Sequence, residues 1–270
     1  MGLFDWLFHR KHRRRAEIAA GPFPREWERI LSGNVDAYSR LPADQPPQLQ
    51  KLVQVFVAEK KFIGSGGVQI DDEIKVTVAG QACILLLGLP ELGVYPRVHE
   101  IIVYPHDFGE VVEAVGPDGR RYRIPAELAG QAWHRGPVVL DWDSVEHSVY
   151  SPCDGYNVVY HEFAHALDMQ SGGRADGIPP LATKEQLAAW SRVFDAAYST
   201  FREAAQRGEP TFIDPYGASS PAEFFAVVTE HFFEQPRRMR AKHPELYEQL
   251  RLFYRQDPVR WQHPRTGHWA

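Results

Sequence analysis

The segment from Asn157 to Gln170 constrains the fold of this chain more than any other stretch. It contains two histidines, His161 and His165, that are four residues apart, and Glu162 follows the first of them. In a helix with 3.6 residues per turn, this spacing places both imidazoles on one face, one turn apart. Two imidazoles so placed are able to take two corners of a tetrahedral zinc site. A carboxylate beside them is able to accept a proton from water, as the general base of a metallopeptidase does.

The other positions of this segment decide between a metal site and a chance pattern. Most of them are apolar, so the predicted helix is largely buried. A polar side chain on a buried helix needs a partner, and a metal ion supplies one. The alternative is a pair of core histidines that share this spacing by chance, in a chain with twelve histidines. The apolar context, with no proline or glycine inside the helix, favours one zinc ion per chain.

The composition sets limits on the class of protein. Apolar residues make up 44% of the 270 residues and charged residues 24%, as in ordinary globular domains. The net charge of −5 gives no reason to expect direct nucleic-acid binding. The two cysteines form neither a ligand-spaced pair nor a disulfide framework, which favours the cytoplasm. The longest apolar run, residues 82–89, is too short to span a bilayer, so no transmembrane segment is expected.

The chain is expected to hold one zincin-like domain over residues 23–270, preceded by a segment over residues 1–22. The first fifteen residues place apolar side chains before a basic run, which is the reverse of the order in a secretory signal. Two interpretations of this segment stay open. One is a short amphipathic helix with a basic end that touches a membrane surface or a partner. The other is a flexible, frayed terminus that packs loosely on the body.

The patterning of the chain changes from helical to strand-like and back. Helices are expected over residues 27–31, 35–41, 48–61, 71–89, 184–207, 222–234 and 245–256, and strands over residues 100–104, 110–115, 120–124 and 137–142. Residues 116–119 carry the turn signal of a hairpin, and residues 63–67 read as a flexible connector. This order predicts an α+β fold with a small mixed or antiparallel sheet and a largely helical C-terminal half.

The last predicted strand is a candidate for substrate binding. It consists of Val138, Val139, Leu140, Asp141 and Trp142 and lies directly before the helix that carries the histidines. In zinc peptidases the edge of such a sheet pairs with an extended substrate by strand addition. The alternative is an interior strand that is paired on both sides.

A catalytic zinc takes three protein ligands and leaves one position open. The metzincin pattern is excluded, because Asp168 and Ser171 stand where that class has glycine and a third histidine. The third ligand is therefore expected to be a carboxylate from another helix. Glu223 is the best candidate, since it lies in the first turn of an apolar helix, where an unpaired carboxylate is costly. Glu230 is the competitor, but a hydrogen bond to a ligand histidine suits it better, and an ion pair with an arginine is the alternative for both.

Two further side chains are candidates for the site. Tyr216 precedes Glu223 by seven residues, and its phenol is suited to donate a hydrogen bond to the oxyanion of a tetrahedral intermediate. Packing of the loop is the alternative role for Tyr216. Asp168 lies one turn after His165, where it either orients a ligand histidine or bonds the backbone at the helix end.

Two blocks of this sequence resemble a known family. Residues 161–168, His-Glu-Phe-Ala-His-Ala-Leu-Asp, followed by residues 216–226, Tyr-Gly-Ala-Ser-Ser-Pro-Ala-Glu-Phe-Phe-Ala, resemble the Mlc titration factor A family of bacterial zinc peptidases. The likeness runs from about residue 23 to the C-terminal helix. The same two blocks are similar to the catalytic domain of anthrax lethal factor, with the same interval between the tyrosine and the glutamate.

The resemblance implies a role for each of five residues. It implies His161, His165 and Glu223 as zinc ligands, Glu162 as the catalytic base and Tyr216 as the oxyanion donor. It also implies a gluzincin-like α+β fold, a cytosolic location and aminopeptidase-type activity on short peptides. Members of the family bind and inactivate the transcriptional repressor Mlc, so the resemblance further implies a repressor as partner.

Two functions from different classes follow. In a zinc peptidase, Glu162 takes a proton from the attacking water and delivers it to the leaving amine. In a regulator that sequesters a transcriptional repressor, zinc serves structure only. The presence of Glu162 and the lack of an evident fourth ligand favour the enzyme. The Gly-x-Met-Glu-Asn motif with which one group of aminopeptidases holds the substrate amine is absent, so the residues do not decide between cleavage at the end and within a peptide.

Overall fold

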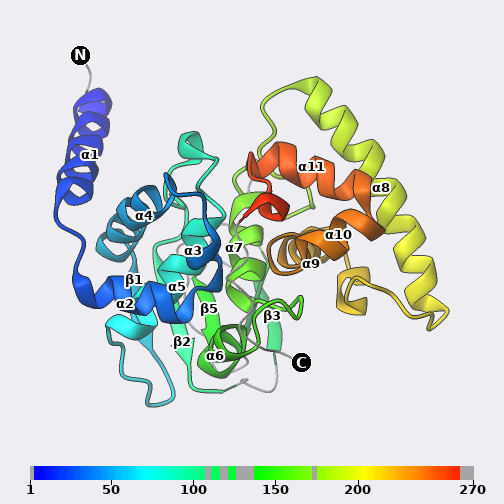
Figure 1. Cartoon of the computed structure of the whole chain (residues 1–270), viewed down its shortest axis with the longest axis horizontal. Coiled ribbons are helices and arrows are strands. Elements are labelled where there is room, and N and C mark those ends of the chain that lie inside the picture. Colours follow the sequence, from blue (N-terminus) through cyan, green and yellow to red (C-terminus); the bar gives the residue numbers. More distant parts are fainter. Residues whose placement is uncertain (1–2, 107–110, 116–120, 126–136, 172–174, 262–270) are drawn as a thin grey trace.

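The structure is a computed structural model that describes residues 3–106, 111–115, 121–125, 137–171 and 175–261 (Figure 1). Its helices are α1 (Leu3–Ala20), α2 (Arg25–Asn34), α3 (Asp36–Arg40), α4 (Pro46–Glu59), α5 (Asp72–Ile84), α6 (Trp142–Tyr150), α7 (Val158–Asp168), α8 (Lys184–Gln206), α9 (Pro221–Glu234), α10 (Pro236–Lys242) and α11 (Pro244–Tyr254). Its strands are β1 (Lys61–Gly64), β2 (Glu100–Tyr104), β3 (Val111–Val115), β4 (Arg121–Pro125) and β5 (Val138–Asp141), and short 3-10 helices are η1 (Pro90–Leu92), η3 (Pro215–Ala218) and η4 (Pro258–Arg260). The fold is α+β and mostly helical, as expected.

The main sheet is parallel, which corrects the prediction of a mixed or antiparallel sheet. Its strands lie in the order β1-β2-β5, with Lys61 opposite Glu100 and Ile101 opposite Val138. Parallel neighbours require a long crossover between strands, and α5 supplies it between β1 and β2. The sequence did not indicate this crossover, because β1 was not predicted. Strand β1 has only four residues and overlaps the glycine-rich residues 63–67.

The predicted hairpin exists as a separate two-stranded sheet. β3 and β4 pair antiparallel, with Val111 opposite Pro125 and Val115 opposite Arg121. The turn expected over residues 116–119 lies outside the described residues. The hairpin therefore accounts for the antiparallel pattern in the sequence, while the separate sheet of β1, β2 and β5 is parallel.

The end of β5 differs from the prediction by one residue. Trp142 begins α6 and does not belong to the strand, because Asp141 caps this helix: its Oδ1 accepts a hydrogen bond from Ser144 N at 2.7 Å. Helix α5 is capped in the same way, since Asp71 Oδ1 accepts from Ile74 N at 2.9 Å. Helices α8, α9 and α11 lie within two residues of the expected ranges, whereas α6 and α10 were not predicted.

Helix α7 runs through the middle of the molecule, between the sheet-containing half and the helices α8 to α11 (Figure 1). On one side it contacts α5, α6 and β5, and on the other side it packs along α9. Phe163 of α7 is fully buried, with its ring 4.6 Å from that of Tyr95 and 5.5 Å from that of Phe56. This burial on both sides fixes the axis of α7.

Helix α9 is buried almost along its whole length. Trp190 of α8 stacks on Phe194 at 3.9 Å between ring centroids and meets Phe225 of α9 at 5.7 Å. At the other end of α9, the ring of Phe233 lies 5.0 Å from that of Tyr254 in α11. Because α9 is held by aromatic side chains from α8 and α11, its carboxylates face α7 in a rigid frame.

The N-terminal segment forms a helix over residues 3–20 in the structure. Its second half packs on the body through Ile18 and Ala19, and Arg15 binds Glu59 of α4 with two hydrogen bonds of 2.6 Å. None of the described helices combines the length and the apolar character that crossing a bilayer requires.

Candidate metal centre

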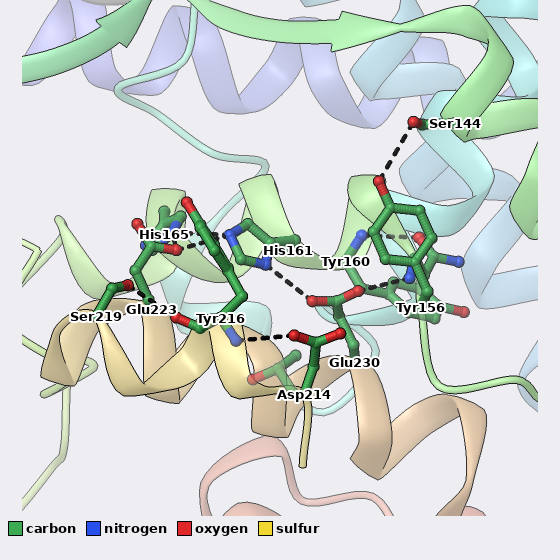
Figure 2. A network of polar contacts seen from close by, with 12 residues as sticks. Ser144, Tyr156, Tyr160, His161, His165, Asp214, Tyr216, Ser219, Glu223 and Glu230 are labelled. Carbon is green, nitrogen blue, oxygen red and sulfur yellow. Dashed lines mark hydrogen bonds and ion pairs between the residues drawn. The ribbon is translucent and has the colours of Figure 1, made fainter. Parts of the chain in front are cut away.

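The start of α7 sets the direction of the two histidines. Asn157 caps the helix, because its Oδ1 accepts a hydrogen bond from Tyr160 N at 2.9 Å. From that start, His161 and His165 fall on one face, and their Nε2 atoms lie 3.2 Å apart (Figure 2). Both imidazoles are therefore directed to one point, as their spacing in the sequence predicts.

Glu223 of α9 meets the two histidines at that point. Ser220 caps α9 by accepting from Glu223 N at 3.2 Å, which places Glu223 in the first turn. Its Oε2 lies 3.0 Å from His161 Nε2 and 3.2 Å from His165 Nε2. Among the described residues, His161, His165 and Glu223 are the one group whose ligand atoms converge as at a metal site.

The size of this triangle fits a tetrahedral zinc site. Ligand atoms at about 2.0–2.1 Å from zinc in a tetrahedral arrangement are separated from one another by about 3.3–3.4 Å. The three separations here are 3.0, 3.2 and 3.2 Å. Two imidazole nitrogens with one carboxylate oxygen are also the donor set of catalytic zinc sites with three protein ligands. The residues therefore fit one metal ion.

The histidines and carboxylates at the site stabilise each other's charged forms. Burial disfavours the charged form of His161, but its hydrogen bonds to Glu223 and Glu230 outweigh burial and raise its pKa to about 10. Burial also opposes ionisation of Glu223, and the hydrogen bonds from His161 and His165 nevertheless lower its pKa. Both shifts follow from the close contact between the imidazole and the carboxylates, and a metal ion bound at the same place would take the position of the shared proton.

Glu230 lies behind His161 and binds it from the side opposite to Glu223. Its Oε1 is 2.8 Å from His161 Nδ1, and its Oε2 accepts from Asn157 N at 2.6 Å. A proton on Nδ1 that is donated to Glu230 leaves the lone pair of Nε2 free to face the metal position. Burial raises the pKa of Glu230, and the bond from His161 acts in the opposite direction.

Asp168 bonds the backbone at the end of α7. Its carboxylate accepts from Gly177 N at 2.7 Å and from Ile178 N at 3.1 Å, and burial raises its pKa to about 6. Of the two roles considered for Asp168, these contacts match the one in which it bonds the backbone at the helix end. Nδ1 of His165 has no hydrogen-bond partner among the residues that the structure describes.

Tyr216 and Glu162 flank the metal position. Tyr216 lies in η3, where Asp214 Oδ1 accepts from its backbone N at 2.8 Å. Its ring centroid is 5.9 Å from that of His161, its side chain lies beside Glu223, and it is 41% exposed (Figure 2). Glu162 is half-buried on α7, and its charge contributes to the raised pKa of His161. Tyr216 thus lies beside the ligand group and Glu162 follows the first histidine on the same helix, while their catalytic roles stay predictions.

Tyr156 is a second phenol beside the site that the sequence pattern did not indicate. It is 43% exposed, and its hydroxyl lies 3.3 Å from Ser144 Oγ (Figure 2). Burial raises its pKa first, and the carboxylates of Asp141, Glu230 and Glu162 raise it further. The sequence gives one indication that Tyr156 lies near the site: it directly precedes Asn157, the residue that caps α7.

The candidate substrate strand lies at the end of the described sheet. β5 pairs with β2 on one side and has no second neighbour in the sheets formed by the described residues. Val138, Leu140 and Asp141 are buried and Val139 is half-buried, while Trp142 belongs to α6. An edge position is what strand addition requires, and the substrate role itself stays a prediction.

Comparisons with known proteins agree with a metal-dependent site. Residues 9–255 match the profile of a family described as glucose-regulated metallo-peptidase M90. A protein named Mlc titration factor A from Edwardsiella ictaluri is 38% identical over 223 residues, which cover 80% of this chain and 82% of that protein. Mlc titration factor A from Yersinia pestis is 32% identical over 273 residues, covering 96% and 94%. An uncharacterized protein, slr2042, from Synechocystis sp. is 37% identical over 250 residues, covering 91% and 89%.

The fold and the His-His-Glu group therefore define a protein of the metallopeptidase type. The chain belongs to the M90 family of glucose-regulated metallopeptidases, which it shares with the Mlc titration factor A proteins.

Proposed function

We propose that this protein is a zinc-dependent peptidase of the gluzincin type, and that it acts as an aminopeptidase on short peptides. One observation carries the proposal. The ligand atoms of His161, His165 and Glu223 form a triangle with sides of 3.0, 3.2 and 3.2 Å, which matches three corners of a tetrahedral site. Three protein ligands leave the fourth position for water or substrate, as in catalytic zinc sites.

The chain's own residues then have separate tasks. A zinc ion held by the three ligands supplies Lewis-acid chemistry, because it polarises the scissile carbonyl and acidifies water. Glu162 accepts a proton from the attacking water and passes it to the leaving amine. Glu230 keeps the His161 ring oriented through the bond to Nδ1.

Two further elements bind the substrate. The phenol of Tyr216 donates a hydrogen bond to the developing oxyanion, and its position beside His161 and Glu223 supports this role. The edge strand β5 pairs with the backbone of an extended peptide. We also propose a cytoplasmic location, which is supported by the two free cysteines, Cys83 and Cys153.

Replacement of the proposed base tests the enzyme. Glu162→Gln keeps the size of the side chain but removes its ability to accept a proton. We expect kcat on alanyl and longer fluorogenic peptides to fall by at least about 10²-fold, the lower range for loss of a general base. Zinc content, measured by metal analysis, should stay at one ion per chain.

The matched control is Glu203→Gln on the exposed face of α8, which should cleave like wild type. A wild-type protein that holds zinc but cleaves no peptide of the panel would contradict the proposal. The same panel reports which end of the peptide is cut.

The names of the relatives support a second candidate function. Two relatives over most of the chain are called Mlc titration factor A, a name that points to binding of a repressor. In this alternative the protein sequesters a repressor of the Mlc type, and zinc serves structure. Titration of purified Mlc with wild type and with Glu162→Gln tests it, because a regulator binds equally well without the base. No change in Mlc light scattering or DNA binding at micromolar protein would argue against this function.

A further inference from the structure

The segment between α6 and α7 is fastened to the last turn of α9. Cys153 N donates to Glu234 Oε2 at 2.6 Å, and Gln235 Nε2 donates to Cys153 O at 2.9 Å. Asn157 N donates to Glu230 Oε2 at 2.6 Å, and Asn157 Nδ2 donates to Glu234 Oε1 at 3.1 Å. These four hydrogen bonds join the start of one ligand-bearing helix to the end of the other.

The backbone of this segment is shaped for a close approach to α9. Cys153 has a φ of +70° and Gly155 a φ of +101°, both in the left-handed region. A Cβ at Gly155 would lie 2.6 Å from the ring of His231 on α9. A non-glycine residue in the left-handed region is disfavoured, so the conformation at Cys153 depends on the bonds that hold it.

Asn157 uses both ends of its side chain. Its Oδ1 accepts from Tyr160 N and starts α7, while its Nδ2 donates to Glu234. The amide cannot turn over without losing the helix cap, so its orientation is set by its partners. Asn157 is 2% exposed and Glu234 is 6% exposed, so loss of either partner leaves a buried polar group without its hydrogen bond.

The contacts of Asn157 reach the metal position through Glu230. One oxygen of Glu230 holds Asn157 N, and the other holds His161 Nδ1. A movement of Asn157 therefore moves the carboxylate that orients His161. Outer partners of this kind tune a metal site even though they do not touch the ion.

We propose that Asn157 and Glu234 are positioning residues of the metal centre, which hold α7 against α9 so that His161 and Glu223 meet at one ion. This inference rests on the proposed metal site, but it does not depend on peptide cleavage. Neither side chain contacts a ligand atom; both act through Glu230 and the start of α7.

Reversal of the hydrogen-bond polarity tests the proposal. At about pH 8, where the Glu234 carboxylate is ionised and accepts from both donors, Glu234→Gln forces the new NH2 group against one of them, Cys153 N or Asn157 Nδ2. Asn157→Asp keeps the oxygen that caps α7 but turns the donor that faces Glu234 into an acceptor. In the double variant, the new amide donates to the new carboxylate and its oxygen still accepts from Cys153 N, so the contact is restored with opposite polarity.

The readouts are the zinc dissociation constant, from competition with a chromogenic chelator, and the visible absorption bands of the cobalt-substituted protein. We expect each single variant to weaken zinc binding by about 10-fold, the low end of the range for a direct partner of a metal ligand, because both residues act one step further out through Glu230, and to shift the cobalt bands. The double variant should return to within about threefold of wild type, because the two sites are coupled. The control Thr183→Ala removes the cap of α8; it should lower the melting temperature and leave zinc affinity unchanged.

Any of three results overturns the proposal. The single variants could bind zinc as tightly as wild type, or their losses of zinc affinity could multiply in the double variant. The third result is that Thr183→Ala weakens zinc binding as much as the single variants do. Should a single variant fail to fold, Gln235→Ala removes the bond to Cys153 O on the partly exposed side, together with the acceptor of the exposed Arg238 side chain. It should raise the zinc dissociation constant at an unchanged circular dichroism spectrum, and an unchanged constant counts against the proposal. A wild type that binds zinc but cleaves nothing refutes the peptidase alone, and a wild type that binds no zinc refutes both.

Discussion

The two ends of α9 carry the same kind of side chain in opposite surroundings. At the start, Glu223 is half-buried and faces His161 and His165, whose hydrogen bonds outweigh the effect of burial and lower its pKa. At the end, Glu234 faces the backbone of Cys153 and the side-chain amide of Asn157, and burial raises its pKa to about 7. In our proposal one rigid helix separates two tasks: the end that faces the two histidines offers a carboxylate ligand to a cation, and the end with neutral partners joins two helices.

The largest effect is expected at the start of the helix. Glu223→Gln keeps the shape of the side chain but removes the negative charge that faces the histidines. Zinc affinity should fall by more than about 10²-fold, beyond the range for an outer partner such as Glu230. Isothermal titration with zinc measures it, with Glu203→Gln on α8 as the control. A variant that binds zinc as tightly as wild type would remove Glu223 from the ligand set.

A smaller effect is expected at the end of the helix, as a dependence of stability on pH. The pKa of Glu234 is raised in the folded state, so the folded protein holds this proton more tightly than the unfolded chain. Its contribution to stability is present at low pH and is lost as the pH rises through about 7. As the pH rises from about 5.5 to about 7.5, the contribution of Glu234 to the free energy of unfolding should fall by about 2 kcal/mol.

Urea unfolding of metal-free wild type and Glu234→Gln at several pH values tests this dependence. Titrations of other groups occur in both proteins and cancel in the difference. Stability curves that run parallel over this range would show that Glu234 is ionised in the folded protein throughout.

The smallest effect is expected at a helix cap away from both ends of α9. Thr183 Oγ1 accepts from Gln186 N at 3.2 Å and closes the first turn of α8. Thr183→Ala should lower the free energy of unfolding by about 1 kcal/mol and leave zinc affinity unchanged. Denaturant unfolding with a parallel zinc titration measures both. If Thr183→Ala also weakened zinc binding, zinc affinity would depend on the overall stability of the protein. The contrast between the two ends of α9 would then not explain it.

The candidate metal residues were predictable because polar side chains stand out on apolar helices. His161 and His165 share a helix face by spacing alone, and Glu223 is conspicuous among the phenylalanines of α9. The structure brings these three side chains together. The shared face of the two histidines follows from periodicity, which is a local property of the sequence, whereas their meeting with Glu223 depends on the packing of α7 against α9.

The direction of the main sheet was not predictable from the same signals. A strand as short as β1 shows no alternation of apolar and polar residues from which it could be recognised. The glycine at position 64 is explained by a close contact that only the structure shows, since a Cβ there would lie 2.0 Å from the carbonyl oxygen of Val68. Without β1, the crossover through α5 has no strand to start from. Strand order is a long-range property, so the visible hairpin of β3 and β4 gave the wrong impression of the whole sheet.

The bonds between α9 and the start of α7 were hidden for a similar reason. The left-handed conformations of Cys153 and Gly155 bring the segment to α9, and nothing in the local pattern indicates them. Glu234 reads as an ordinary polar residue at a helix end. Its buried contacts appear only when α7 and α9 are packed side by side.

The central claim is that His161, His165 and Glu223 hold one zinc ion. Crystals grown with zinc and measured on both sides of the zinc absorption edge test it most directly. The account predicts one anomalous peak per chain, bonded to Nε2 of both histidines and to a carboxylate oxygen of Glu223 at about 2.0–2.2 Å. A peak at other residues, or none at this triangle in zinc-saturated crystals, would contradict it.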